Sequence, residues 1–207
     1  MSKTPDATTL LDWAYASRPA GGQSVSGDLH LVQPYQHGVL LAVVDGLGHG
    51  EEAAAAARMA VGILAKHASD SIVPLFQRCH DALAETRGVV ATLVSINAQD
   101  STVTWLGVGN VEGWIIRSGS RAGPPMESVL LRGGLLGYQL PLLQADVTPV
   151  AKGDVLVLAT DGVGPDFAVE ARVAQPSRVI ADRILQRCFK GSDDGLVLVA
   201  RYLGRPA

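Results

Sequence analysis

Acidic residues stand at four places in this sequence where an apolar run begins or ends, each beside a glycine or a second acid. They are Asp28, Asp45, Asp161 and the adjacent pair Asp193-Asp194. A continuous apolar run, such as the one that ends on Asp45-Gly46, is typical of a strand buried on both faces. An acid at the tip of such a strand is carried by a rigid element. The sequence therefore predicts several carboxylates held at strand ends.

Carboxylates at the ends of buried strands are costly unless a positive charge compensates them. Few lysine or arginine residues lie close to these acids in the sequence. Mg²⁺ and Mn²⁺ prefer oxygen ligands, so a divalent cation is the natural compensating charge. For any one of these aspartates, ordinary Asp-Gly turn chemistry is the favoured interpretation. Their recurrence at four strand ends favours a metal site instead.

The elements that would position these acids are strands interrupted by pairs of helices. We predict strands at residues 13–16, 29–32, 39–45, 89–96, 102–107, 112–117, 155–160 and 195–202, and helices at residues 51–67, 72–85, 166–173 and 177–189. Residues 1–12 are expected to form a loose N-terminal segment, residues 34–38 a turn and residues 118–125 a loop. Residues 129–150 are predicted to be irregular, with short strands around Gly133-Gly134 and Gly137. This order predicts an α+β fold within a single domain spanning residues 1–207, in which antiparallel sheets carry helices on their outer faces.

Composition argues against several classes of function. The net charge is −3 and no basic run is present, so we expect no nucleic-acid partner. No uncharged apolar stretch reaches the roughly 18 residues of a membrane span, and the first residues lack the order of a signal peptide. Cys79 and Cys188 both fall in predicted helices and are expected to be core residues, not a disulfide framework. A cytoplasmic protein without a membrane partner is therefore expected.

Five motifs then occur in the order found in the metal-dependent protein phosphatases of the PPM (2C-type) class, which this sequence resembles over about residues 22–203. The motifs are Gly27-Asp28, Val44-Asp45-Gly46-Leu47-Gly48-His49-Gly50, Gly107-Val108-Gly109-Asn110, Thr160-Asp161-Gly162 and Asp193-Asp194. The Gly-His-Gly ending and the compact length are similar to the bacterial SpoIIE-type branch, and within it to the stand-alone phosphatases of stressosome signalling. The resemblance implies a four-layer αββα sandwich, in which two stacked antiparallel sheets are flanked by helices.

The resemblance also implies a site for two Mn²⁺ or Mg²⁺ ions. Asp45 would bridge the two ions, and the carbonyl oxygen of Gly46 would bind one of them. Asp161 and Asp193 would complete the shell of the first ion, while Asp28 would hold the second directly or through water. Asp45 and Asp161 would thereby act in catalysis through a metal-bound water.

The sequence departs from the family pattern at two places. A small residue and a threonine usually follow the last acidic pair, whereas Gly195-Leu196 follows here. Eukaryotic relatives place a histidine two residues after the bridging aspartate, where this sequence has Leu47. His49 is therefore interpreted as a loop residue in preference to a general acid.

Three further residues are candidates for the surroundings of the site or for a contact with phosphate: His49, Asp194 and Arg18. For Arg18, a solvated surface arginine is the favoured interpretation. Asn110 is expected to stabilise a turn, with a place near the site as the alternative.

The implied reaction is the hydrolysis of phosphoserine or phosphothreonine by a water that two metal ions activate. The implied substrate is a phosphorylated STAS-domain scaffold protein of the stressosome, whose dephosphorylation would reset stress signalling. One alternative is a partner-activated phosphatase of an anti-anti-sigma factor, of the RsbU or SpoIIE kind. Another is a catalytically silent module that binds phosphoproteins. A monomer is expected.

Overall fold

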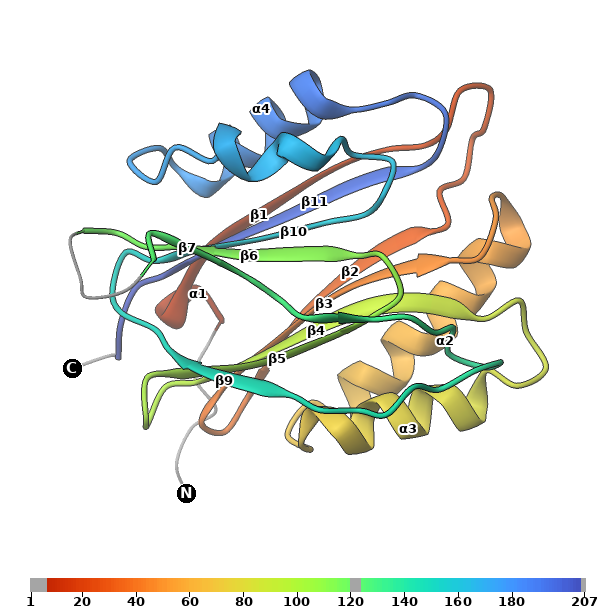
Figure 1. Cartoon of the computed structure of the whole chain (residues 1–207), viewed down its shortest axis with the longest axis horizontal. Coiled ribbons are helices and arrows are strands. Elements are labelled where there is room, and N and C mark those ends of the chain that lie inside the picture. Colours follow the sequence, from red (N-terminus) through yellow and green to blue (C-terminus); the bar gives the residue numbers. More distant parts are fainter. Residues whose placement is uncertain (1–6, 120–123, 206–207) are drawn as a thin grey trace.

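Two β-sheets stacked face to face form the centre of the protein in the computed structural model, which describes residues 7–119 and 124–205. Helices cover the outer face of each sheet, so four layers follow one another across the molecule (Figure 1). This arrangement confirms the predicted α+β sandwich.

The first sheet has the strand order β1-β11-β10-β6-β7. Its members are β1 (Leu11–Arg18), β11 (Gly195–Tyr202), β10 (Val155–Ala159), β6 (Glu112–Ile116) and β7 (Met126–Ser128). The strand nearest the C-terminus, β11, lies between β1 and β10 and pairs antiparallel with both. All eight residues of β1 pair with β11, from Leu11 opposite Tyr202 to Arg18 opposite Gly195.

The second sheet has the order β2-β3-β4-β5-β8, and β9 also pairs with β5. Its members are β2 (Asp28–Tyr35), β3 (Gly38–Gly46), β4 (Val89–Asn97), β5 (Thr102–Val108), β8 (Leu131–Arg132) and β9 (Asp146–Pro149). The short pair of β5 and β8 is parallel, whereas the other pairs of this sheet are antiparallel. The central strand β3 is buried along almost its whole length, as its apolar run predicts.

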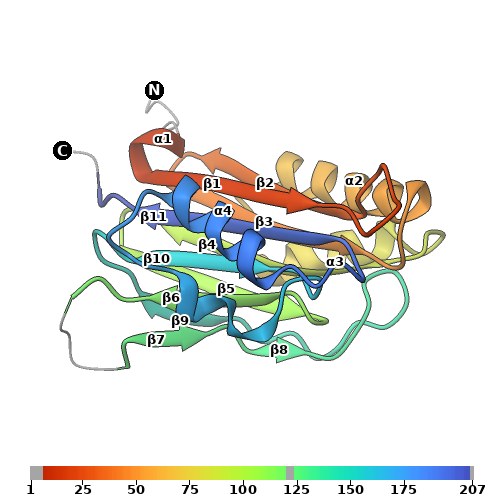
Figure 2. The ribbon, with the colours of Figure 1, turned by 90° about the horizontal axis from the view of Figure 1, so that it is seen from above.

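Helices α2 (Glu51–Lys66) and α3 (Ile72–Ala82) cover the second sheet, while α4 (Ser177–Cys188) and the 3₁₀ helix η1 (Pro165–Glu170) cover the first. Glu51 and Glu52 lie in the first turn of α2 and Lys66 in its last, where each charge is favourable with the helix dipole. Its buried face is mainly alanine, which lets α2 approach the sheet closely. Figure 2 shows α4 lying across the strands of the first sheet. No helix in the described part of the chain is long and apolar enough to cross a membrane.

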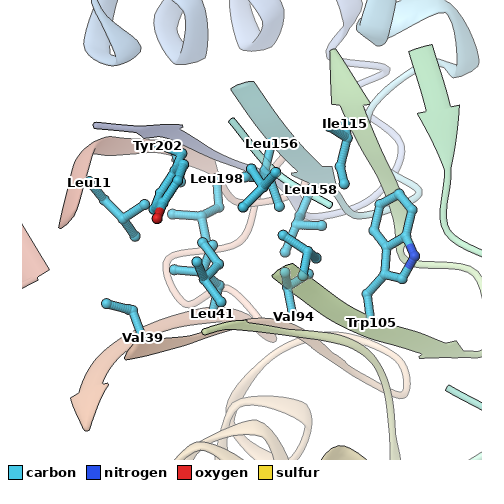
Figure 3. Close-up of a cluster of buried hydrophobic side chains, with 14 of the residues drawn as sticks. Leu11, Val39, Leu41, Val94, Trp105, Ile115, Leu156, Leu158, Leu198 and Tyr202 are labelled. Carbon is cyan, nitrogen blue, oxygen red and sulfur yellow. The ribbon is translucent and has the colours of Figure 1, made fainter. Parts of the chain in front are cut away.

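The main core fills the space between the two sheets. Leu156, Leu158 and Leu198 point from the first sheet toward Leu41 and Val94 of the second (Figure 3). Each of these side chains is at most 1% exposed. Two further clusters are present, one between each sheet and the helices that cover it. Cys79 is buried in the cluster beneath α2 and α3, as expected.

Several predicted boundaries were wrong. Residues 7–12 are not loose, because α1 (Ala7–Leu10) precedes β1, whose first residue is Leu11; residues 1–6 lie outside the described part of the chain. The strand predicted at residues 29–32 continues through Pro34 to Tyr35, so the predicted turn at residues 34–38 is shorter. Proline is tolerated there because β2 is an edge strand, where a missing N–H need not break the ladder.

The irregular stretch at residues 129–150 also differs in detail. Its strands are β8 and β9 in place of strands at Gly133-Gly134 and Gly137, where isolated bridges join Leu135 to Gln139 and Leu136 to Val89. The helix predicted at residues 166–173 is the shorter η1. Within the predicted loop at residues 118–125, residues 120–123 lie outside the described part of the chain.

Candidate metal centre

The strand ends that carry the predicted acids meet at one end of the sandwich. β3 and β10 end there on Gly46 and Ala159, while β2 and β11 begin there at Asp28 and Gly195. In Figure 1 this is the right-hand end, where α2 follows β3. The strand ends of both sheets therefore contribute to one region, as the sequence predicted.

Asp28 and Asp45 face each other directly across the antiparallel pair of β2 and β3. Asp28 is 4% exposed, and Asp45 is partly buried. The hydroxyl of Thr160 donates a hydrogen bond of 2.7 Å to Oδ2 of Asp28, so a residue of the first sheet reaches an acid of the second. Two carboxylates are thus held close together with little access to water.

The surroundings of this pair disfavour the ionised form of both carboxylates. The pKa of Asp28 is raised to about 7, chiefly by burial; the hydrogen bond from Thr160 opposes this rise, and the charges of Asp194, Asp193 and Asp161 contribute to it. The pKa of Asp45 is raised to about 8, chiefly by burial and then by the neighbouring carboxylates, first among them Asp28. A cation bound between these groups would restore their ionised form.

Asp45, Asp161 and Asp193 line a common cleft of about 310 Å³. The remaining lining residues are Leu47, Gly48, Val90, Gly109, Asn110, Gly133 and Gly134. Asp28 is not part of the lining but is paired with Asp45 between β2 and β3. The structure therefore brings together all four predicted metal-binding aspartates.

Two glycines allow the backbone to pack tightly around the cleft. A Cβ atom on Gly46 would lie 2.2 Å from the carbonyl oxygen of Ala53, because the start of α2 packs directly against the end of β3. A Cβ atom on Gly162 would lie 1.9 Å from the carbonyl oxygen of Asp194. Glycine is needed at both positions, because a side chain would push apart the segments that carry the acids.

The two neighbouring acids of the last motif have different environments. Asp193 is exposed and lines the cleft. Asp194 is 3% exposed and accepts hydrogen bonds from the backbone N–H groups of Ala20 and Gly27, at 2.7 and 2.6 Å. Asp194 therefore ties the loop between β1 and β2 to the start of β11, and both of its carboxylate oxygens are engaged in doing so.

The other two candidate residues lie outside the lining of the cleft. His49 is exposed in the loop between Gly46 and α2. Arg18 is also exposed, and its guanidinium lies over the ring of Phe189, 5.2 Å from the ring centre. The structure thus gives neither residue a contact with the carboxylates.

Sequence reasoning missed two residues of the site and left a third open. Thr160 was noted only as part of the Thr-Asp-Gly motif, although its position next to Asp161 was a usable signal. Lys190 was not identified, and its ammonium donates a hydrogen bond of 2.6 Å to the backbone carbonyl of Asp161. Asn110 was expected to stabilise a turn, but its side-chain amide donates a hydrogen bond of 2.8 Å to Oδ2 of Asp161.

The chemistry of these donors fits Mg²⁺ or Mn²⁺, because carboxylate and carbonyl oxygens are the ligands that hard divalent cations prefer. Within residues 7–119 and 124–205, no three His, Cys, Asp or Glu side chains already form a ready-made metal cage. Asp45, Asp161 and Asp193 instead lie around the lining of one cleft. Their raised pKa values identify the place where a cation would be stabilised.

Comparison with known proteins identifies the family. The family described as Stage II sporulation protein E (SpoIIE) matches residues 35–202. Phosphoserine phosphatase RsbX of Bacillus subtilis (strain 168) is 26% identical over 176 residues, which cover 84% of this chain and 85% of RsbX.

Solved structures show the same fold. A structure from work on the bacterial stressosome, described as a modular system adapted to control secondary messenger signaling, is 30% identical with a TM-score of 0.84. The match covers 92% of this chain and 99% of the other. RsbX in complex with magnesium has a TM-score of 0.81 at 21% identity, over 98% of this chain and 100% of RsbX. The chain therefore belongs to the SpoIIE family of PP2C-type, metal-dependent protein serine/threonine phosphatases.

Proposed function

We propose that this phosphatase hydrolyses phosphoserine or phosphothreonine on a phosphorylated STAS-domain scaffold protein of a stressosome, and so resets stress signalling. The similarity to RsbX, a phosphoserine phosphatase, and to a structure from work on the stressosome supports this substrate class. The catalytic part of the proposal depends on one observation: Asp45, Asp161 and Asp193 line one cleft, and Asp28 lies directly opposite Asp45.

In this proposal two Mn²⁺ or Mg²⁺ ions occupy the cleft. Asp45 would contribute to holding both, because it stands both beside Asp28 and in the cleft with Asp161 and Asp193. The carboxylates of Asp161 and Asp193 and the carbonyl oxygen of Gly46 would hold one ion, and Asp28 would hold the other. When bound, such ions supply a water of lowered pKa for hydrolysis and neutralise charge on phosphoryl oxygens.

The chain itself supplies position and access. The buried ends of β2 and β3 fix Asp28 and Asp45, so that these carboxylates need little reorganisation. Leu47 and Gly48 lie at the edge of the cleft and are exposed, which leaves the site open to a phosphorylated side chain presented by another protein. No nucleophilic side chain of the protein is required, because the attacking group is water.

The test is to incubate the protein with a phosphorylated stressosome scaffold protein, with and without Mn²⁺, and to follow phosphate loss site by site. We expect Mn²⁺-dependent removal of phosphate from the STAS domain, and no removal by Asp45→Ala. A phosphorylated anti-anti-sigma factor serves as the competing substrate. Preference for that protein, or activity only after a partner is added, would replace the proposal with a partner-activated phosphatase of the RsbU kind.

Hydrolysis of an aryl phosphate tests the catalytic activity independently of the proposed protein substrate. Metal-dependent hydrolysis without any action on either phosphoprotein would show that the proposed substrate class is wrong. The absence of turnover with any divalent metal would contradict the metal mechanism itself. The cytoplasmic location, the single domain and the monomeric state remain predictions from the sequence.

A further inference from the structure

Asn110 makes a contact that its position in the sequence does not suggest. It lies in the turn between β5 and β6 and is exposed, yet its side-chain amide donates to Oδ2 of Asp161 at 2.8 Å, across 51 residues of sequence. The pairing of β6 with β10 explains this proximity. Glu112 is opposite Ala159 in that antiparallel ladder, so continuing both segments by two residues places Asn110 beside Asp161.

Asp161 is also held from its backbone side. The ammonium of Lys190 donates to the carbonyl oxygen of Asp161 at 2.6 Å, and the backbone N–H of Lys190 donates to the carbonyl oxygen of Gly162 at 2.9 Å. The two bonds from Lys190 fix the main chain at Asp161 and Gly162, and the bond from Asn110 fixes the carboxylate of Asp161. The two donors come from separate segments, so the orientation of Asp161 does not depend on its own turn alone.

We propose that Asn110 is a positioning residue, which binds one carboxylate oxygen of Asp161 so that the other faces the divalent ion. This inference depends on the proposed function, because it takes Asp161 as a metal ligand. Replacing a partner that orients a ligating side chain typically weakens metal binding by about 10- to 100-fold.

The side-chain type suits this task. A carboxylate only accepts hydrogen bonds, so the amide nitrogen of Asn110 must face it. A neutral amide orients Asp161 without adding a positive charge that would compete with the ion. An aspartate at this position would place a second negative charge against Asp161 and could not donate a bond.

The decisive measurement is the dissociation constant for Mn²⁺ of the full chain, taken by calorimetry without substrate. We expect Asn110→Ala to weaken Mn²⁺ binding by roughly 10- to 100-fold, and Asn110→Gln, which keeps the amide, to weaken it less. The matched control is Asn97→Ala. Asn97 also donates from its amide to an aspartate, Asp100, at 3.0 Å, but in the turn between β4 and β5. This control should change Mn²⁺ affinity by less than about twofold.

A double-mutant cycle adds a second test. In an Asp161→Asn background, Asn110→Ala should cause little further loss of Mn²⁺ affinity, since the two residues act as a unit. Additive losses, or wild-type affinity in Asn110→Ala, would overturn the proposal. Because Asn110 is exposed, these variants are expected to fold, and circular dichroism checks this.

Kinetics with an aryl phosphate separate positioning from substrate contact. At limiting Mn²⁺, Asn110→Ala should lose activity in proportion to its lost affinity, while at saturating Mn²⁺ kcat should recover and KM should stay unchanged. A raised KM with unchanged Mn²⁺ affinity would assign Asn110 to substrate binding and overturn the proposal. If the wild-type chain binds Mn²⁺ but does not dephosphorylate STAS phosphoproteins, only the proposed substrate is contradicted. If the wild-type chain binds no Mn²⁺, both the proposed function and the positioning role of Asn110 are overturned.

Discussion

Two clusters of acidic side chains lie at opposite ends of the sandwich and are compensated in different ways. At the cleft end, Asp28 and Asp45 are surrounded by other carboxylates, and their pKa values are raised to about 7 and 8, first by burial. At the other end, beyond the last residue of β6 and just before β10, Arg117 binds Glu127 and Asp154.

The second cluster is satisfied by the chain itself. Arg117 donates to Oδ2 of Asp154 at 3.1 Å, and the backbone N–H of Ser118 donates to its Oδ1 at 2.9 Å. The side chains of Arg117 and Asp154 are 7% and 0% exposed. Burial alone would lower the pKa of the Arg117 guanidinium, but the hydrogen bonds and charges of Glu127 and Asp154 outweigh it and raise that pKa.

The comparison separates two uses of a buried acid. Asp154 has a cation supplied by the fold, so it stabilises the folded chain. The pKa values of Asp28 and Asp45 are raised first by burial and then by neighbouring like charges, so the two ionised carboxylates cost stability until a cation arrives from solution. Acids of the second kind identify a functional site better than a count of acidic residues does.

The largest expected effect is on activity at the cleft. Asp45→Asn should reduce metal-dependent phosphatase activity by roughly a thousandfold or more, because it removes the carboxylate that both ions are proposed to share. The measurement is kcat/KM with an aryl phosphate at saturating Mn²⁺. Asp146→Asn, an exposed acid at the start of β9, is the control and should retain activity. Comparable activity in the two variants would contradict the metal site.

The next largest effect is on stability at the other end. Asp154→Ala should lower the free energy of unfolding by about 3 kcal/mol, because it leaves Arg117 buried with one partner fewer. Chemical denaturation measures this directly. At a temperature where the variant stays folded, its affinity for Mn²⁺ should equal that of the wild type. A loss of Mn²⁺ affinity would show that the two clusters are coupled.

The stability of the metal-free protein should depend on pH through the carboxylates at the cleft end. The folded pKa values of Asp28 and Asp45 lie above the ordinary value of 3.8, so the folded state binds more protons than the unfolded state at intermediate pH. The stability of the metal-free protein should therefore fall as pH rises from about 4 to about 8, by up to about 1.4 kcal/mol per pH unit for each group.

Thermal unfolding across this pH range tests the prediction. Mn²⁺ or Mg²⁺ should reduce the decline, and Asp45→Asn should do the same without metal, because it removes one of the titrating groups. An Asp45→Asn variant whose stability falls with pH as steeply as that of the wild type would show that Asp45 does not carry the effect.

The smallest effect is expected at Thr160. Thr160→Val should cost about 1 kcal/mol of stability and weaken Mn²⁺ binding a few-fold at neutral pH. In the wild type the hydrogen bond from Thr160 lowers the pKa of Asp28. Without this bond the pKa of Asp28 rises, so protons compete better with the metal. Thr148→Val is the matched change in the other cluster, where Thr148 donates to Glu127. It should affect stability but not Mn²⁺ affinity, and an equal loss of affinity would remove the distinction.

The sequence predicted the architecture and the gathering of acids because both depend on local patterns. Apolar runs that end on Asp-Gly located β3 and β10. What the sequence could not predict depends on contacts between distant segments. The bond from Asn110 to Asp161 depends on the register of β6 and β10. The bond from Lys190 to the carbonyl oxygen of Asp161 depends on where the chain runs after the end of α4.

The different roles of Asp193 and Asp194 were also beyond local patterns. Neighbouring residues in an extended segment point in opposite directions, but nothing local shows which direction faces the cleft. The bonds from Ala20 and Gly27 to Asp194, across more than 160 residues, settle this only in the folded chain. The proposed binding of metal by individual aspartates remains a prediction for the experiments above.

The position of β11 has a consequence for synthesis of the protein. Because β11 is inserted between β1 and β10, the first strand of the sheet must wait for residues 195–202 before it can pair. Contacts of such long sequence separation form slowly, and a nascent chain cannot make them until the ribosome has released this segment. Asp193 precedes the same strand, so the proposed metal centre also cannot assemble before this segment has left the ribosome.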